Sequence, residues 1–152
     1  MIRIVTGDLL DANADALVNA VNTEGVMGKG IALQFKKAYP RMFEHYAAAC
    51  KSGEVRIGRM HVFDLGAAST PRYIINFPTK ASWRSTSKLA YIRAGLEGLV
   101  IELTSRNIRT VAIPSLGCGL GGLAWKDVLP MIEDSLGSEP EIEALVYAPP
   151  SI

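Results

Sequence analysis

The sequence lacks the features that define several large classes of protein. It has only two cysteines in 152 residues, Cys50 and Cys118, which excludes a disulfide framework and suits a reducing compartment. It contains no apolar run near the ~18 residues of a membrane-spanning helix. Met1 is followed at once by a strand-like segment. We therefore expect no membrane span, no cleaved signal peptide and a cytoplasmic location.

The sequence also lacks a dominant charge. Sixteen Lys and Arg balance fifteen Asp and Glu, so the net charge of +1 indicates no particular partner. Hydrophobic residues make up 49% of the chain and charged residues 20%, which is typical of a globular protein rather than a disordered one. The length fits one ordinary domain, and we expect a single domain over residues 1–152.

One stretch has no acidic residue at all, because no Asp or Glu lies between Asp64 and Glu97. Its basic and aromatic residues are Arg72, Tyr73, Phe77, Lys80, Trp83, Arg84, Lys88, Tyr91 and Arg93. Basic and aromatic side chains in alternation favour phosphates or a single strand of nucleic acid. Solvated charges around an ordinary core explain the same composition equally well.

Known catalytic and metal-binding patterns are missing too. The chain contains no H-E-x-x-H, no cluster of Cys and His, and no G-x-S-x-G. Neither His45 nor His61 lies in a loop suggestive of catalysis, so Cys118 has no evident general base. We expect no metal and no cofactor, and we interpret Cys118 as a small residue of a loop.

Apolar segments alternate between the strand and helix types along the chain. Strands are expected at 1–5, 16–21, 59–64, 72–77, 110–113 and 144–147, and helices at 28–39, 41–51, 86–105 and 125–136. Pro78 is expected to end the fourth strand, and Ser85, Thr86 and Ser87 are candidate N-caps of the third helix. This order predicts an α/β sandwich with a largely parallel sheet, in which ligands bind beyond the carboxyl ends of strands.

Two glycine-rich loops follow predicted strands. Residues 25–32 combine glycines with a helix start, which can bind an anion through backbone N–H groups, although a helix-entry turn needs the same glycines. Residues 115–122 contain G-x-G-x-x-G, but the next strand ends in Ala-Pro-Pro instead of the acidic residue of a Rossmann fold. A backbone cradle for phosphate remains the interpretation of this second loop.

A third candidate segment, residues 76–80, leaves a strand inside the acid-free stretch. Its Lys80 can bind phosphate as a point charge, or attack a carbonyl carbon once its amine is neutral. A surface lysine after a turn is the simpler alternative. Near the N-terminus, Asp8 can accept hydrogen bonds from an amino group such as that of adenine, or it can cap a turn.

Together these segments resemble the macrodomain family of ADP-ribose-binding modules. The resemblance lies in residues 6–9, 19–22, 25–32, 76–80 and 113–123, which follow the family's order along nearly the whole chain. It implies a three-layer α/β/α sandwich around a mixed, mainly parallel sheet, with a cleft for ADP-ribose. Residues 27–30 and 76–80 are similar to the DarG branch of the DarT/DarG toxin–antitoxin pairs. That branch hydrolyses the N-glycosidic bond between ADP-ribose and thymidine in single-stranded DNA.

The resemblance implies roles for individual residues. Asp8 would accept from the adenine amine beside the Leu9 amide, Asn22 would hold the distal ribose, and Lys80 would act at its anomeric carbon. The residues implied to surround ADP-ribose are Asp8, Leu9, Asn19, Ala20, Val21, Asn22, Gly28, Lys29, Gly30, Ile31, Ala32, Leu33, Thr79, Gly117, Cys118, Gly119, Leu120 and Gly121. Contacts with DNA are expected at Arg72, Trp83, Arg84 and Lys88. Related hydrolases carry a carboxylate in the second glycine loop, and residues 117–122 have none; Lys80 would therefore work alone or with groups of the substrate.

The implied partners are ADP-ribose, ADP-ribosylated single-stranded DNA and the DarT toxin, the last through a region outside this chain. Two other functions remain open. The glycine loops alone would suffice for a reader that binds ADP-ribose without cleaving it. A hydrolase could also act on ADP-ribose linked to Asp or Glu of proteins, or on acetylated ADP-ribose.

Overall fold

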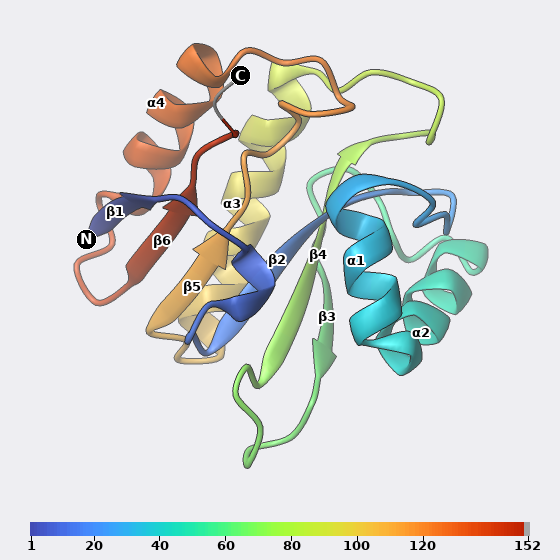
Figure 1. The fold of residues 1–152 in the computed structure, drawn as a ribbon, viewed down its shortest axis with the longest axis horizontal. Coiled ribbons are helices and arrows are strands. Elements are labelled where there is room, and N and C mark those ends of the chain that lie inside the picture. Colours follow the sequence, from blue (N-terminus) through green and yellow to red (C-terminus); the bar gives the residue numbers. More distant parts are fainter. Residues whose placement is uncertain (151–152) are drawn as a thin grey trace.

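The computed structural model describes residues 1–150 and consists of a six-stranded sheet between two pairs of helices (Figure 1). The elements in chain order are β1 (Ile2–Val5), the short 3-10 helix η1 (Leu9–Asp11), β2 (Ala16–Asn22), α1 (Gly30–Ala38), α2 (Pro40–Lys51), β3 (His61–Asp64), β4 (Tyr73–Lys80), α3 (Leu89–Ser105), β5 (Thr110–Ile113), α4 (Trp125–Leu136) and β6 (Glu143–Tyr147). Every expected strand and helix is present, with small shifts at the ends.

The sheet has the strand order β1-β6-β5-β2-β4-β3. All neighbouring strands run parallel except β3, which pairs antiparallel with β4 at one edge. The expected α/β fold with a mixed, mainly parallel sheet is therefore confirmed. Because helices cover both faces, the central strands β2 and β4 are buried almost throughout, as their nearly continuous apolar sequences predict.

Two apolar clusters fill the space between the sheet and its helices. Successive strand residues point to opposite faces, so Ile74 packs in the cluster under α1 and α2 while Ile75 packs in the cluster under α3 and α4. Figure 1 shows these two helix pairs at opposite sides of the view. Close packing of α3 on β4 requires Gly95, where a Cβ would collide with the Phe77 ring.

Strand β4 continues through Pro78 to Lys80, so the expectation that Pro78 ends this strand is wrong. The pairing with β3 stops at Asn76, and beyond that residue β2 alone, among the strands of residues 1–150, lies beside β4. A residue without an N–H is tolerated there because no ladder on the β3 side needs it. As a result, Thr79 and Lys80 are held by the sheet rather than by a loop.

Helix α3 begins at Leu89 with Lys88 as its N-cap, and no side chain caps it. The expected caps Ser85, Thr86 and Ser87 are therefore wrong. Ser85 instead bonds within a turn with Ser82, and the Ser87 amide donates to Gly121 O at 3.0 Å. Residues 81–88 thus form a separate connection between β4 and α3, called the arm below.

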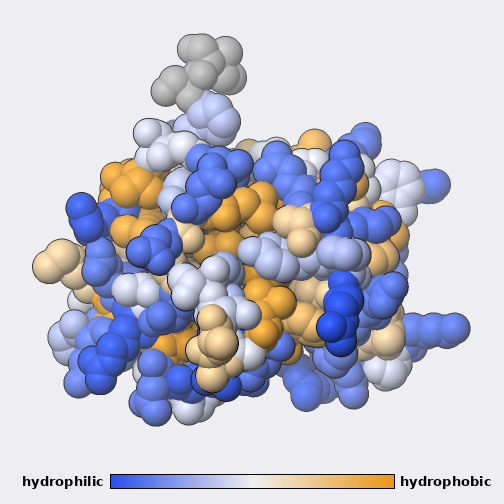
Figure 2. Space-filling model, turned by 60° about the horizontal axis from the view of Figure 1, so that its bottom comes forward, coloured by the Kyte–Doolittle hydropathy of each residue, from blue (hydrophilic) through white to orange (hydrophobic). Residues whose placement is uncertain are grey.

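The surface in Figure 2 is mostly hydrophilic, and its apolar side chains show mainly between and beneath the hydrophilic ones. Among residues 1–150, none of the helices has the length and apolar character that crossing a membrane requires.

Candidate functional site

The carboxyl ends of the five parallel strands surround a cleft of about 780 Å³. That volume lies in the usual range of ligand sites, and the position is the one at which parallel α/β sheets bind ligands. The described residues that line the cleft are Gly7, Asp8, Leu9, Ala20, Val21, Asn22, Val26, Gly28, Lys29, Gly30, Ile31, Ala32, Gln34, Thr79, Lys80, Trp83, Pro114, Ser115, Gly117, Gly119, Leu120, Gly121, Tyr147, Ala148 and Pro150.

The structure brings most of the predicted ADP-ribose residues to this cleft. All of them line it except Asn19, Leu33 and Cys118, and Lys80 lines it as well. The three loops singled out in the sequence therefore meet at one place, although 36 residues lie between Lys80 and Gly117 along the chain. A parallel sheet explains this, because the carboxyl ends of its strands share one edge.

Asn19 lies beneath the cleft instead of lining it. It is completely buried, and its Nδ2 donates to Asn76 Oδ1 at 3.1 Å and to the Met27 sulfur at 3.7 Å. These bonds connect β2 to β4 and to the loop that precedes α1. The side chain thus supports the floor of the site rather than contacting a ligand there.

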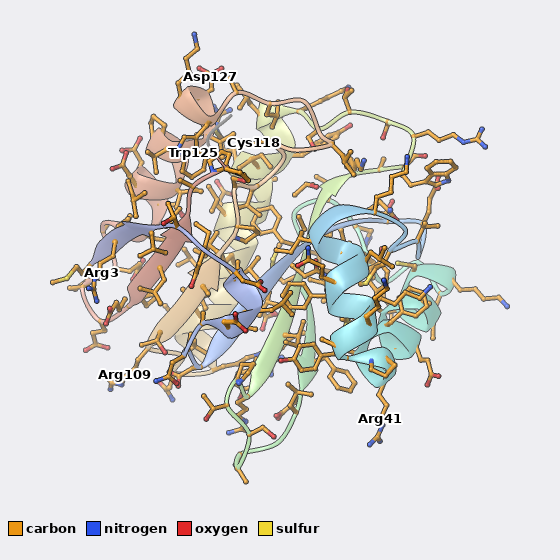
Figure 3. The ribbon with its side chains drawn as sticks, viewed as in Figure 1. Arg3, Arg41, Arg109, Cys118, Trp125 and Asp127 are labelled. Atoms are coloured by element: carbon orange, nitrogen blue, oxygen red, sulfur yellow. The ribbon has the colours of Figure 1, made fainter. Side chains whose placement is uncertain are left out.

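Cys118 is half-buried and does not line the cleft. It packs against the same apolar cluster as Trp125, and Figure 3 draws the two residues in the same region, at the upper end of the sheet. Its sulfur lies 3.6 Å from Leu116 O. Burial raises the pKa of the Cys118 thiol to about 11, so at neutral pH it is protonated and unreactive.

Asn22 both lines the cleft and holds a turn. Its Oδ1 accepts from the amides of Glu24 at 3.0 Å and Val26 at 3.4 Å, and its Nδ2 donates to Val26 O at 2.9 Å. The buried Tyr46 hydroxyl donates to Asn22 O at 2.7 Å. Burial raises the Tyr46 pKa far above its ordinary value, so the phenol keeps its proton and remains a donor.

The start of α1 forms one wall. Lys29 is the N-cap and makes no side-chain cap bond, and Gly30 has a φ of +61°, which favours glycine. No acidic residue lies in the first turn of this helix. Its first amides therefore lie at the cleft without a side-chain partner, and the helix dipole favours an anion at this point.

The second glycine loop forms the opposite wall. Gly117 has a φ of +73°, and Leu123 N donates back to Gly117 O at 2.9 Å. A Cβ at Gly121 would collide with the Ser87 hydroxyl and with the Gly117 carbonyl oxygen. The loop is therefore closed tightly on itself and on the arm, and glycine is required for packing as well as for backbone conformation.

Lys80 is the last residue of β4 and pairs with Asn22 of β2. Its amine Nζ donates to Trp83 O at 3.3 Å. Among the described residues that line the cleft, Asp8 is the sole carboxylate, and it follows β1 rather than the glycine loop. The site therefore offers Lys80 no carboxylate partner from residues 117–121.

Some lining residues lie outside the segments that the sequence analysis singled out, namely Gln34, Tyr147, Ala148 and Pro150. The rule about strand ends would have found Tyr147, because it is the last residue of β6. Burial and the Asp11 and Asp8 carboxylates raise the Tyr147 pKa, which places its phenol near the acidic residues that follow β1.

The four residues predicted to contact DNA are not all in one place. Trp83 lines the cleft, the Arg84 guanidinium lies 4.7 Å from the centre of its ring, and Lys88 ends the arm. Arg72 immediately precedes β4, at the end of that strand opposite to Lys80, and pairs with Asp64 at 3.1 Å. The structure brings Trp83, Arg84 and Lys88 into the arm and leaves Arg72 remote from it.

A chain of polar side chains leads from Asn19 to the surface. Asn76 Nδ2 donates to His61 Nδ1 at 3.0 Å, so the other ring nitrogen, Nε2, carries the proton and donates to His45 Nδ1 at 2.8 Å. Burial, together with the neighbouring His45, lowers the pKa of His61 to about 4. His61 is therefore neutral at physiological pH.

The low pKa of His61 predicts a loss of stability in acid. Between pH 6.5 and about 4, His61 binds a proton in the unfolded chain but not in the folded protein. The unfolding free energy therefore falls as the pH is lowered through this range. At most the slope is about 1.4 kcal/mol per pH unit for one proton. Urea titrations should show a shallower fall for His61→Gln than for the unchanged protein. Parallel pH curves for the two proteins would contradict this.

Within residues 1–150, no group of three or more His, Cys, Asp or Glu side chains is arranged to hold a metal ion.

Comparison with known proteins identifies relatives of this chain. A family model described as Macro domain matches residues 18–132. A Mycobacterium tuberculosis protein named DNA ADP-ribosyl glycohydrolase is 54% identical over 98% of this chain, and one from Thermus aquaticus is 48% identical over 98%. The chain spans only 42% and 41% of the lengths of these two proteins.

Solved structures agree with the sequence relatives. The macrodomain of Mycobacterium tuberculosis DarG has a TM-score of 0.96 and 53% identity, and the match covers 99% of both chains. Thermosipho africanus DarTG in complex with ADP-ribose has a TM-score of 0.90 and 32% identity over 99% of this chain and 43% of that one. With a family model that covers most of its length and a fold that matches throughout, the chain belongs to the macrodomain family.

Proposed function

We propose that this chain is a DNA ADP-ribosyl glycohydrolase that releases ADP-ribose from thymidine in single-stranded DNA. The observation that carries the proposal is the meeting of two glycine-rich backbone walls and the Lys80 amine in one cleft. The two relatives that are 54% and 48% identical, and bear this name, align over 98% of the chain. Residues 1–152 act in this proposal as one macrodomain.

ADP-ribose would occupy the cleft from β1 to β4. Asp8 would accept from the adenine amine beside the Leu9 amide, and the diphosphate would lie between the start of α1 and residues 117–121. Backbone N–H groups on both walls suit this dianion, because they donate without bringing bulky side chains. The distal ribose would then reach Asn22, Thr79 and Lys80 at the ends of β2 and β4.

Hydrolysis breaks the bond between the anomeric carbon of this ribose and the thymine nitrogen. The electron pair of that bond leaves with the nitrogen, which takes up a proton, while the oxygen of a water molecule bonds to the carbon. In this proposal Lys80 acts at the anomeric carbon, and the glycine loop offers it no carboxylate partner. The backbone walls bind the rest of the substrate and supply its orientation.

The decisive experiment compares two substrates. The protein is incubated with an oligonucleotide ADP-ribosylated on thymidine and, in parallel, with a protein ADP-ribosylated on Asp or Glu, and released ADP-ribose is measured by chromatography. We expect release from the DNA. Release from the modified protein alone would favour the alternative activity on ADP-ribose linked to Asp or Glu of proteins. Calorimetric binding of ADP-ribose with no release from either substrate would identify a reader.

Binding of single-stranded DNA should depend on salt through the arm. Each phosphate contact on a single strand contributes about −0.7 to the slope of log K against log salt. The double variant Arg84→Ala, Lys88→Ala should therefore flatten the slope by about 1.4 in fluorescence anisotropy titrations. Arg72→Ala is the matched control, since Arg72 is paired with Asp64 away from the arm, and its slope should equal that of the unchanged protein. An unchanged slope in the double variant would show that the arm cations do not contact phosphate.

The wider biological role follows from the same proposal. A Thermosipho africanus protein, 31% identical over 97% of this chain, is named a DNA ADP-ribosyl transferase–DNA ADP-ribosyl glycohydrolase fusion, so transferase and hydrolase occur in one polypeptide there. We infer that this chain counteracts a DarT-type toxin as an antitoxin, with direct toxin contact through a region outside these residues. An enzyme acting on bacterial DNA works in the cytoplasm, which is the location we propose.

A further inference from the structure

The arm, residues 81–88, is fixed to the cleft at both ends. At its start, Thr23 Oγ1 donates to Ala81 O at 2.7 Å, which connects the arm to the end of β2. At its end, Ser87 N donates to Gly121 O at 3.0 Å, which connects it to the second glycine loop. The arm therefore connects the end of β2 to the second glycine loop, which is one of the two walls between which ADP-ribose would lie.

The turn in the middle of the arm is held by its own serines. The Ser85 hydroxyl donates to Ser82 O at 2.9 Å and accepts from the Ser82 amide at 3.0 Å. The Ser82 hydroxyl accepts from the Arg84 amide at 3.2 Å. Trp83 thus lies on a turn whose backbone is already ordered, so a ligand that binds its ring does not have to order it first.

Trp83 exposes an unusually large apolar side chain beside the candidate active site. The residue is 44% exposed and lines the cleft. The Arg84 guanidinium lies 4.7 Å from the ring centroid, within the range of a cation–π contact. An indole that is partly covered by a cation and partly open to a cleft suits a planar, aromatic partner with an attached phosphate.

The position of Trp83 relative to Lys80 decides which part of a substrate it meets. The Lys80 amine donates to the backbone oxygen of Trp83 at 3.3 Å, and both side chains belong to residues that line the cleft. If Lys80 acts at the anomeric carbon, the group bonded to that carbon leaves the cleft next to Trp83. In modified thymidine this group is a flat aromatic base, whereas in a modified Asp or Glu it is a carboxyl ester without a ring.

We propose that Trp83 is the residue that selects the leaving group, by stacking on the nucleobase from which ADP-ribose is released. The inference rests on the proposed function and deepens it, because it explains how a macrodomain cleft distinguishes a nucleobase linkage from a protein ester. Stacking of this kind binds the base, and because the base is bonded to the reacting carbon, it also holds that carbon at the Lys80 amine.

The test uses Trp83→Ala and Trp83→Phe with two substrates: the modified oligonucleotide and ADP-ribosylated thymidine as a single nucleoside. For Trp83→Ala we expect kcat/KM to fall by about 5- to 150-fold on both, the range known for loss of one base–aromatic stack. Trp83→Phe keeps a ring and should recover most of this loss. Ile101→Ala, on the exposed side of α3, is the control and should not change either value.

Calorimetry with free ADP-ribose, which has no base at its anomeric carbon, separates stacking from damage to the fold. Its affinity should be the same in Trp83→Ala as in the unchanged protein. Loss of ADP-ribose affinity in that variant, or an unchanged kcat/KM on the nucleoside, would overturn the proposal. If the unchanged protein releases no ADP-ribose from modified DNA, the proposed function itself fails, which is a different result from an active enzyme that is indifferent to Trp83.

Discussion

Replacing Lys80 with alanine is expected to abolish release of ADP-ribose from modified DNA while leaving the affinity for ADP-ribose nearly unchanged. Under the proposed function the amine acts at the anomeric carbon, and loss of such a group typically slows a reaction by about 100- to 10,000-fold. Its side chain makes one hydrogen bond, to Trp83 O in an exposed position, so the fold depends little on it. Single-turnover kinetics on a modified oligonucleotide and calorimetry with ADP-ribose measure the two effects separately.

Lys80→Arg distinguishes a nucleophilic role of the Lys80 amine from an effect of its positive charge. Arginine keeps the positive charge but does not lose its proton in proteins, so it cannot act as a nucleophile. If Lys80 attacks the anomeric carbon, Lys80→Arg should be as inactive as Lys80→Ala. Substantial activity in Lys80→Arg would reduce the role of Lys80 to electrostatic stabilisation, and a normal rate in Lys80→Ala would refute the assignment.

Gly121→Ala should weaken ADP-ribose binding and destabilise the fold together. Gly121 does not have a positive φ, so the obstacle is space: the new methyl group would collide with the Ser87 hydroxyl and the Gly117 carbonyl oxygen. Because one of these is backbone, the loop has to move, and such overpacking costs about 1–3 kcal/mol of unfolding free energy. If the loop amides bind the diphosphate as proposed, a displaced amide loses a bond to a charged phosphate worth about 1.5–3 kcal/mol, so ADP-ribose affinity should fall about 10-fold or more.

Gly119→Ala is the matched variant for the stability half of this prediction. Gly119 lies two residues away in the same loop, has no positive φ, and a Cβ there would meet nothing within 4 Å. Urea unfolding should therefore give Gly119→Ala the stability of the unchanged protein and Gly121→Ala a lower one. Equal stabilities would mean that the loop accommodates a methyl group at position 121, and that Ser87 does not hold it in place.

A polar residue near the end of a strand can support a binding site from below without lining it. Asn19 and Asn22 lie on the same strand, and the resemblance implies that both contact ADP-ribose. In the structure Asn22 lines the cleft and holds the turn after β2, whereas Asn19 bonds to Asn76 inside the protein. Both asparagines contribute to the site, Asn22 at its surface and Asn19 from beneath it.

The amino-acid sequence alone determined the elements and the fold class, because both depend on short windows of apolar spacing and turn residues. It also singled out the two glycine loops and Lys80, whose roles in binding and catalysis remain predictions. The strand end at Pro78 and the caps of α3 were wrong for a common reason. Each depended on a neighbour distant in sequence: the end of the β3–β4 pairing in one case, and Gly121 accepting from Ser87 in the other.

Only the tertiary structure decided which residues meet. It placed Arg72 at the opposite end of β4 from Lys80, left Asn19 and Cys118 outside the lining of the cleft, and brought Tyr147 into it. These outcomes follow from strand order and register, which are set by the packing of the whole sheet between its helices. Local sequence specifies which way a side chain points along its own strand, but the identity of its neighbour across the sheet is a property of the complete fold.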